Sequence, residues 1–192
     1  MLIAECGTLL RGELSLTAVV PHEGSPLGAL AGTVREMVQA YADDGATFSG
    51  KGDAVNALAS YYYGFGWLHF GMAYGLFAYA GKKPACPFAG QTGRIPAALA
   101  DRLEEKTSRY LRLLELACSS VGRAPDRDTA AGAFADRILL AGTCYAREGK
   151  TLLFLGERET ALACFSYGHG WIDAGVRAGL FVVAANRDIF TI

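Results

Sequence analysis

Apolar residues recur along the chain at the spacing of helix faces. Between residues 96 and 121 they form one stripe with near-heptad spacing, and charged residues fill most of the other positions. An apolar stripe of this kind is typical of a helix that packs one face on a core, and Pro96 suits a first helical turn. The pattern predicts an amphipathic helix over residues 96–121. Its stripe consists of Leu99, Leu103, Tyr110, Leu114, Ala117 and Val121.

The first 20 residues carry a similar but weaker pattern, with leucines at positions 2, 9, 10, 14 and 16. Gly7 and Gly12 weaken this helix, because glycine costs about 1 kcal/mol relative to alanine inside a helix. Residues 17–20 include β-branched side chains, which favour extended backbone. We predict a helix here whose end can turn extended.

Residues 54–81 contain no Asp, Glu, Lys or Arg. A membrane-spanning helix needs only about 20 apolar residues, so length alone permits a span here. The stretch also carries Asn56, Ser60 and His69, together with several glycines and tyrosines. The remainder of the chain decides between a membrane span and a buried helix.

The chain contains an internal duplication. A shift of 104 residues places residues 41–77 on residues 145–181 without a gap, and 16 of the 37 positions are identical. In the second copy the helix equivalent to the uncharged stretch carries five charges, which are Glu157, Arg158, Glu159, Asp173 and Arg177. So many charges are incompatible with a lipid environment. We therefore interpret residues 54–81 as a buried helix of a soluble bundle.

Each copy also contains the signals of a helical hairpin. Gly52 and Gly156 suit the left-handed position that ends a helix. Asp53 and Glu157 follow them, where a negative charge complements the N-terminal dipole of the next helix. We predict an all-α fold of two tandem three-helix repeats, residues 1–81 and 96–192, joined by a linker loop at 82–95. The uncharged helix needs more apolar cover than its own repeat supplies, so the repeats should pack as one pseudo-two-fold bundle.

Four glycines at helical spacing predict a contact surface. Gly71 and Gly75 are four residues apart, as are Gly175 and Gly179. Because glycine lowers helix stability, we interpret these pairs as places where the third helices of the two repeats, or two subunits, approach closely.

Three consecutive tyrosines, Tyr61, Tyr62 and Tyr63, cannot all face the inside of a helix that has one exposed face. At least one should lie at the surface. Tyr61 and Tyr62 are therefore further candidates for an interface with a protein partner.

Composition narrows the function classes. The chain has 18 Lys and Arg against 19 Asp and Glu, so no broad basic field attracts nucleic acid or an anionic membrane. The cysteines are odd in number, far apart and without a C-x-x-C motif. This usage favours a reducing cytoplasm over a disulfide framework.

His169 and Asp173 are four residues apart and share a helix face. One reading is structural, with Asp173 accepting a hydrogen bond from His169. The other is a metal-binding or acid–base pair. Under a pseudo-two-fold packing His69 can approach the pair, which would supply two imidazoles and one carboxylate to a metal.

Four aromatic residues recur at equivalent positions of the two copies: Trp67 and Trp171, Tyr63 and Tyr167. Aromatic side chains of this kind form core with a bonded polar tip. The alternative is an aromatic-lined pocket for a small molecule, in which these residues and His69 are the ligand-binding candidates.

The second copy ends in SYGHGWIDAGVRAGLF, with a His-Gly-Trp-x-Asp cluster at residues 169–173. In this it resembles a small archaeal three-helix family known as domain of unknown function 357, and the resemblance covers about residues 100–182. The first copy departs from the pattern, since Phe65 stands in place of the histidine and His69 in place of the aspartate. The resemblance implies an archaeal, cytosolic, all-helical protein and no known activity.

No signature of a hydrolase nucleophile, a zinc protease or a nucleotide-binding loop occurs in the sequence, and we expect no cofactor. We expect a non-catalytic binding or scaffolding protein that associates with itself or with another protein. The alternative is a metal- or small-molecule-dependent enzyme that uses His169 and Asp173.

Overall fold

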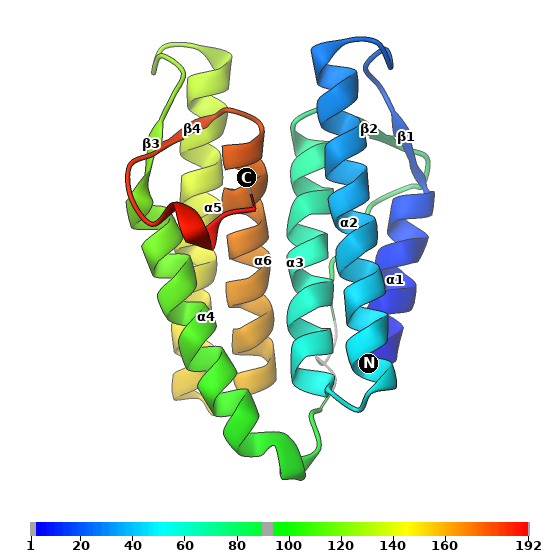
Figure 1. Cartoon of the computed structure of the whole chain (residues 1–192), viewed down its shortest axis with the longest axis vertical. Helices are drawn as coiled ribbons and strands as arrows, with labels where there is room; N and C mark the ends of the chain where they lie inside the picture. Colours follow the sequence, from blue (N-terminus) through cyan, green and yellow to red (C-terminus); the bar gives the residue numbers. More distant parts are fainter. Residues whose placement is uncertain (1–2, 90–93, 192) are drawn as a thin grey trace.

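Each repeat folds into three helices, as the pattern predicts. The computed structural model describes residues 3–89 and 94–191. The helices of the first half are α1 (Ile3–Ser15), α2 (Pro26–Gly50) and α3 (Ala54–Ala73), and those of the second are α4 (Ala100–Ser120), α5 (Ala130–Phe154) and α6 (Arg158–Arg177). The two halves stand side by side (Figure 1). The all-α fold of two three-helix repeats is confirmed.

A short antiparallel ribbon closes each half. β1 (Thr17–Val19) pairs with β2 (Phe77–Tyr79), and β3 (Val121–Arg123) pairs with β4 (Phe181–Val183). Each ribbon ties the end of the first helix of a repeat to the chain that leaves the third helix. The extended end predicted for residues 17–20 is thus confirmed. Two single 3₁₀ turns, Ala97–Leu99 and Arg187–Ile189, precede α4 and follow β4.

Glycines in the left-handed conformation end four of the helices. Gly52 and Gly156 have φ of 76° and 81°, which confirms the predicted hairpin turns. Gly75 has φ of 83°, and the backbone amide that follows it bonds back to the Gly71 carbonyl at 2.9 Å. This is the six-to-one bond of a glycine helix cap. The third helix therefore ends at Ala73, and the prediction that it continues to residue 81 is wrong.

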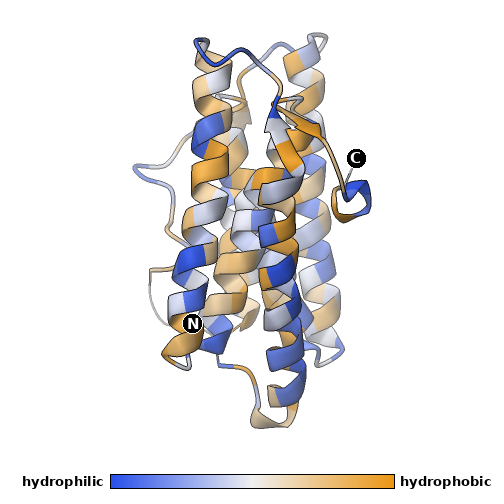
Figure 2. Cartoon of the chain, turned by 90° about the vertical axis from the view of Figure 1, so that its left-hand side faces the viewer, coloured by the Kyte–Doolittle hydropathy of each residue, from blue (hydrophilic) through white to orange (hydrophobic). Residues whose placement is uncertain are grey.

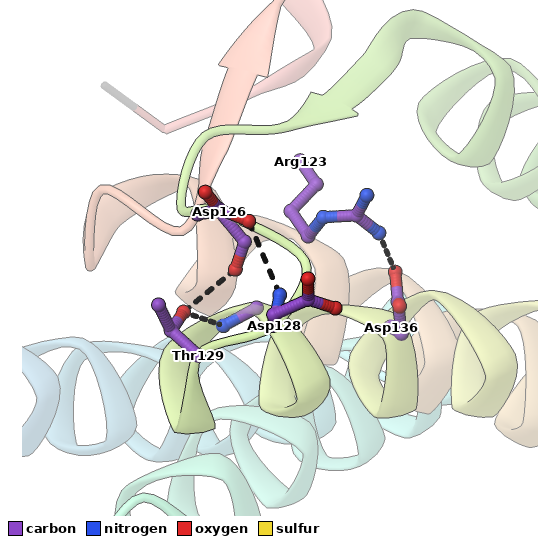
Figure 3. Close-up of polar contacts among 6 residues, drawn as sticks. Arg123, Asp126, Asp128, Thr129 and Asp136 are labelled. Carbon is purple, nitrogen blue, oxygen red and sulfur yellow. Dashed lines mark hydrogen bonds and ion pairs between the residues drawn. The ribbon is translucent and has the colours of Figure 1, made fainter.

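The start of the second helix is also duplicated. The Thr129 hydroxyl donates to the Asp126 carbonyl at 2.6 Å and accepts from the Gly132 amide at 3.0 Å (Figure 3). Ser25 caps the Gly28 amide in the same way, also at 3.0 Å. Such caps satisfy amides that have no partner inside the helix. The repeat therefore extends upstream of the segment aligned by sequence.

The third helices form the centre of the molecule. α3 and α6 lie next to each other and run in the same direction (Figure 1). α4 covers the outside of α6 with many hydrophilic residues turned to solvent (Figure 2). Gly66 and Gly170 occupy equivalent positions and make the closest approach, since a Cβ on either would lie 2.5 Å from a carbonyl oxygen of the opposite helix. Equivalent residues therefore meet across the pseudo-two-fold axis.

The glycine pairs proposed from spacing do not make this contact. A Cβ on Gly71 would meet the Phe77 ring at 2.5 Å, and one on Gly175 would meet the Phe181 ring at 2.7 Å. Both glycines are buried inside their own half, while Gly75 and the equivalent Gly179 are exposed helix caps. The prediction that these four glycines join the third helices is wrong, and the two buried ones cannot reach another subunit.

The three consecutive tyrosines are all buried. Tyr61 packs against Gly7 and Gly45, the Tyr62 hydroxyl donates to the Pro87 carbonyl at 2.7 Å, and Tyr63 points toward α6. α3 is covered on every side by α1, α2, α6 and the segment that follows β2. The prediction that at least one tyrosine reaches the surface is therefore wrong. No helix in the described part of the chain is long and apolar enough to cross a membrane.

Candidate functional site

Two reciprocal contacts cross the interface between α3 and α6. The Tyr63 hydroxyl donates to Asp173 Oδ2 at 2.7 Å, and the Tyr167 hydroxyl lies 2.7 Å from His69 Nδ1. Tyr63 and Tyr167 are equivalent under the 104-residue shift, and so are His69 and Asp173. The structure thus divides the residues singled out from sequence between two clusters, one on each face of the central helix pair.

The first cluster holds His169 and Asp173 beneath the C-terminal segment. Asp173 is fully buried and accepts hydrogen bonds from Tyr63 and from both the amide and the hydroxyl of Thr191. Burial lowers the pKa of His169, and the nearby Asp173 charge opposes that shift. Phe190 covers the imidazole edge-on, with ring centroids 6.4 Å apart. Asp173 therefore anchors the end of the chain, and its donors are Tyr63 and Thr191 rather than the predicted His169.

The proposed three-ligand metal site does not form. His69 contacts Tyr167, on the opposite side of the central pair from the contacts of His169 and Asp173. Within residues 3–89 and 94–191, no group of three or more His, Cys, Asp or Glu is placed to hold a metal ion. The pseudo-two-fold axis separates equivalent side chains here instead of bringing them together.

The second cluster lines a groove with a volume of about 540 Å³. Its walls carry four aromatic rings, those of Phe88, Tyr145, Tyr167 and Trp171. Phe88 stacks on Tyr145 at 5.5 Å between centroids and meets Tyr167 edge-on at 5.4 Å. Ligand pockets are typically concave and apolar with few polar groups. This groove has that character.

His69 supplies a polar group to the groove. Its Nδ1 atom contacts the Tyr167 hydroxyl, whereas its Nε2 atom is buried and has no hydrogen-bond partner in the described part of the chain. Burial lowers the pKa of His69 to about 4, against a smaller opposing effect of the Glu13 charge. The imidazole is therefore neutral near pH 7. A buried polar atom without a partner is costly, and a ligand that bonds to it recovers that free energy.

Residues 83–88, hereafter the covering segment, form the rim of the groove. The buried Glu13 carboxylate accepts from the Ala85 amide at 2.9 Å and from the Tyr79 hydroxyl at 3.0 Å. Tyr62 holds the Pro87 carbonyl from beneath. These bonds fix the covering segment from two sides, so the rim is pre-formed.

The other aromatic candidates divide between core and groove. Trp67 is fully buried core, as one of the two readings predicts. Its indole nitrogen has no hydrogen-bond partner in the described part of the chain, so the predicted bonded polar tip is wrong for this residue. Its equivalent Trp171 is only partly buried and forms a wall of the groove, 6.2 Å from the Phe70 ring. Tyr63 belongs to the Asp173 cluster on the opposite face.

Sequence reasoning missed Phe88, Tyr145, Cys86 and Lys83 as groove residues, and Glu13 as their support. Tyr145 had a signal, since it is identical to Tyr41 in the duplication. The others lie on a loop or depend on one, and no periodicity fixes the path of a loop.

The fold and the two clusters define a class: a duplicated three-helix bundle that joins its repeats through their third helices. The chain belongs to the family described as "Protein of unknown function (DUF357)", whose model matches residues 8–77 and 109–181. Both repeats match, so the first, with its Phe65 and His69, is a genuine copy of the family unit. No curated protein and no solved structure matches the chain.

Proposed function

We propose that the protein is a non-catalytic binding protein and that its ligand is a small molecule held in the aromatic groove. One observation carries the proposal: four aromatic rings surround a pre-formed groove in which the buried Nε2 atom of His69 has no partner. The cluster with the catalytic candidates supports this choice. There Asp173 receives three hydrogen bonds and Phe190 covers His169, which is an arrangement suited to structure.

Cysteine reactivity offers a test with an internal control. Cys86 is exposed and lines the groove, whereas Cys144 is exposed on α5 and does not line it. Burial raises the pKa of Cys6 and Cys118 to about 11 and that of Cys164 to about 12, so these thiols react slowly. Small aromatic compounds that bind, found by saturation-transfer NMR, should slow the reaction of Cys86 with iodoacetamide and leave Cys144 unchanged.

A matched pair of variants locates the binding. Cys86→Trp fills the groove from its rim, and Cys144→Trp places the same side chain on an exposed face outside it. Binding should be lost only in Cys86→Trp. Compounds that bind equally well to both variants would show that the groove is not the site.

Scaffolding and self-association stay predictions. Four of the residues proposed for an interface, Tyr61, Tyr62, Gly71 and Gly175, are buried within the chain and do not support them. The mass of the protein in solution, measured by light scattering, tests them. We further propose that the protein works in the cytoplasm of an archaeon. Its five free cysteines support the cytoplasm, and the family resemblance supports the source.

A further inference from the structure

A second cavity occupies the equivalent position on the other face of the central helix pair. Its lining includes Tyr41, Tyr63 and the four residues 188–191, and its volume is about 190 Å³. The 104-residue shift relates these to Tyr145, Tyr167 and residues 84–87, all of which line the groove. The two cavities are therefore versions of one site. The smaller cavity shows which groups of the chain can cover such a site.

The C-terminal segment forms one wall of the smaller cavity. The side chain of Phe190 is buried there, with its ring against His169. The next residue, Thr191, bonds to Asp173 through its amide and its hydroxyl. At the smaller cavity the chain itself thus supplies an aromatic ring and, on the next residue, a hydrogen-bonding group.

At the equivalent positions the covering segment does not supply these two groups to the groove. Cys86 stands in the position of Phe190, is smaller and is exposed. Pro87 stands in the position of Thr191, and proline has neither an amide hydrogen nor a polar side chain to offer. The residue equivalent to Asp173 is His69, and no group of the covering segment bonds to its buried Nε2 atom. The Nε2 atom of His169 in the other cavity is also buried without a partner in the described part of the chain, but there Phe190 covers the imidazole. The covering segment places the Phe88 ring against Tyr145 and Tyr167, but it offers no hydrogen-bonding group to His69. A volume of about 540 Å³ stays open in the groove.

The direction of the missing hydrogen bond follows from the tyrosines. The Tyr63 hydroxyl must donate to the carboxylate of Asp173, which has no hydrogen to give. If Tyr167 acts as its equivalent and donates to His69 Nδ1, the neutral imidazole carries its hydrogen on Nε2. The group that completes the site is then a hydrogen-bond acceptor.

The charges at the rim indicate whether the acceptor group of the ligand is neutral or anionic. Lys83 lines the groove, Lys82 precedes it, and both are exposed. The other charge near His69 is that of Glu13, whose carboxylate is already held by Tyr79 and Ala85. The Glu148 charge acts on Tyr145 from outside the lining, and the charge in the lining itself is that of Lys83. This positive charge favours an acidic ligand.

Resting on the proposed function, we infer that the ligand is a planar aromatic carboxylate. Its ring lies among the four aromatic rings that line the groove. One carboxylate oxygen accepts the hydrogen bond from His69 Nε2, and Lys83 faces the charge.

Two probes of the same shape distinguish a preference for an anionic ligand, which is this inference, from binding of any aromatic compound, which is the proposed function. The probes are 2-naphthoate and its neutral analogue 2-naphthamide, with dissociation constants measured by calorimetry on the full chain. We expect both to bind and 2-naphthoate to bind more tightly. Lys83→Met should weaken only 2-naphthoate, by about threefold, as for an exposed charge pair. His69→Phe should weaken both probes by about tenfold, the usual effect of one lost hydrogen bond.

The tautomer of His69 provides a readout that needs no binding variant. Long-range ¹⁵N NMR of the imidazole should show Nε2 protonated and Nδ1 unprotonated in the free protein, with the signals assigned from their loss in His69→Phe. A proton on Nδ1 instead would overturn the inference that the ligand is an acceptor. Equal affinity for the two probes, unchanged in Lys83→Met, would overturn the anionic ligand but leave the groove as a binding site. Binding of neither probe, with no protection of Cys86 by any other aromatic compound, would overturn the proposed function itself.

Discussion

Glycines at equivalent positions of this chain do three different kinds of work. Gly66 and Gly170 let two helix backbones touch, Gly71 and its equivalent make room for a phenylalanine ring, and Gly75 and its equivalent end a helix. The six form three pairs that are identical in the duplication, so the sequence does not distinguish their roles. Their roles differ because their neighbours differ.

Alanine at Gly66 should destabilise the fold. The added Cβ meets the Tyr167 carbonyl at 2.5 Å and the Gly170 Cα at 3.0 Å, and backbone atoms cannot rotate away. We expect the free energy of unfolding to fall by about 1–3 kcal/mol. The control is Gly32→Ala within α2, where nothing lies within 4 Å of the new Cβ. That variant should gain up to about 1 kcal/mol. Urea unfolding measures both, and equal effects would contradict the close approach of the helices.

His69 should make the fold sensitive to acid. Its pKa is about 4 in the folded protein, below the ordinary value of 6.5 that the unfolded chain regains. The unfolded state therefore binds a proton first as the pH falls from 6.5 to 4, and stability declines over that interval. The loss should reach on the order of 3 kcal/mol at pH 4.

Unfolding free energies measured at several pH values test this effect. The pH dependence should be smaller in His69→Phe than in the wild-type protein. Identical pH slopes in the wild type and His69→Phe would show that the imidazole is not held neutral by the fold. His169 should act in the same direction, because burial lowers its pKa as well.

At the scale of elements, the two segments that follow the ribbons are the parts that distinguish the halves. Both run over the central helix pair, one on each face (Figures 1 and 2). Residues 187–191 bury Phe190 and bond Thr191 to Asp173, which leaves a cavity of about 190 Å³. The covering segment leaves a larger groove of about 540 Å³. One architecture thus yields a structural contact on one face and a candidate binding site on the other.

Asp173→Asn should release the C-terminal segment. The amide oxygen can still accept hydrogen bonds, but the NH₂ group must face a donor that one Asp173 oxygen now accepts from, so a buried hydrogen bond is lost. We expect a loss of about 2–3 kcal/mol in unfolding free energy and faster hydrogen exchange of the Thr191 amide, measured by NMR. Asp188→Asn, at an exposed position of the same segment, is the control. An unchanged exchange rate at Thr191 in Asp173→Asn would contradict the anchoring role.

At the scale of the molecule, the two halves share one core. The contact between α3 and α6 is as extensive as the contacts of these helices with α2 and α5 inside their own halves. The uncharged α3 obtains from α6 the cover that its own repeat lacks. We therefore expect the halves to unfold together rather than as separate domains.

The two tryptophans, one in each half, allow that expectation to be measured. Trp67→Phe leaves Trp171 as the only fluorescent indole, and Trp171→Phe leaves Trp67. In each variant the fluorescence transition in urea should coincide with the loss of helical circular dichroism. Separate transitions for the two probes would indicate independent domains.

Much of the fold was predictable from the sequence, because a duplication supplies two independent copies of every local signal. The hairpin glycines Gly52 and Gly156 and the rejection of a membrane span follow from comparing the copies, and the amphipathic fourth helix follows from its own apolar stripe. The end of the third helix was missed, since Gly75 was interpreted as a packing residue instead of a cap. The three tyrosines were misjudged because α3 has no exposed face at that level.

The candidate site was predictable only in part. Tyr167, Trp171 and His69 were recognised as residues that could line a pocket, but their grouping was not, since pairs related by the repeat were expected to meet. Backbone equivalents do meet, at Gly66 and Gly170. Side chains that leave the helices away from the axis end on opposite faces instead.

The sequence by itself determined the repeat, the helices and the turns, because these depend on interactions between residues near each other in the chain. Only the tertiary structure decided which glycines join the helices and which aromatic residues line the groove with His69. Those outcomes depend on distances between α3, α6 and the segments that cross them, and such distances arise when the halves pack.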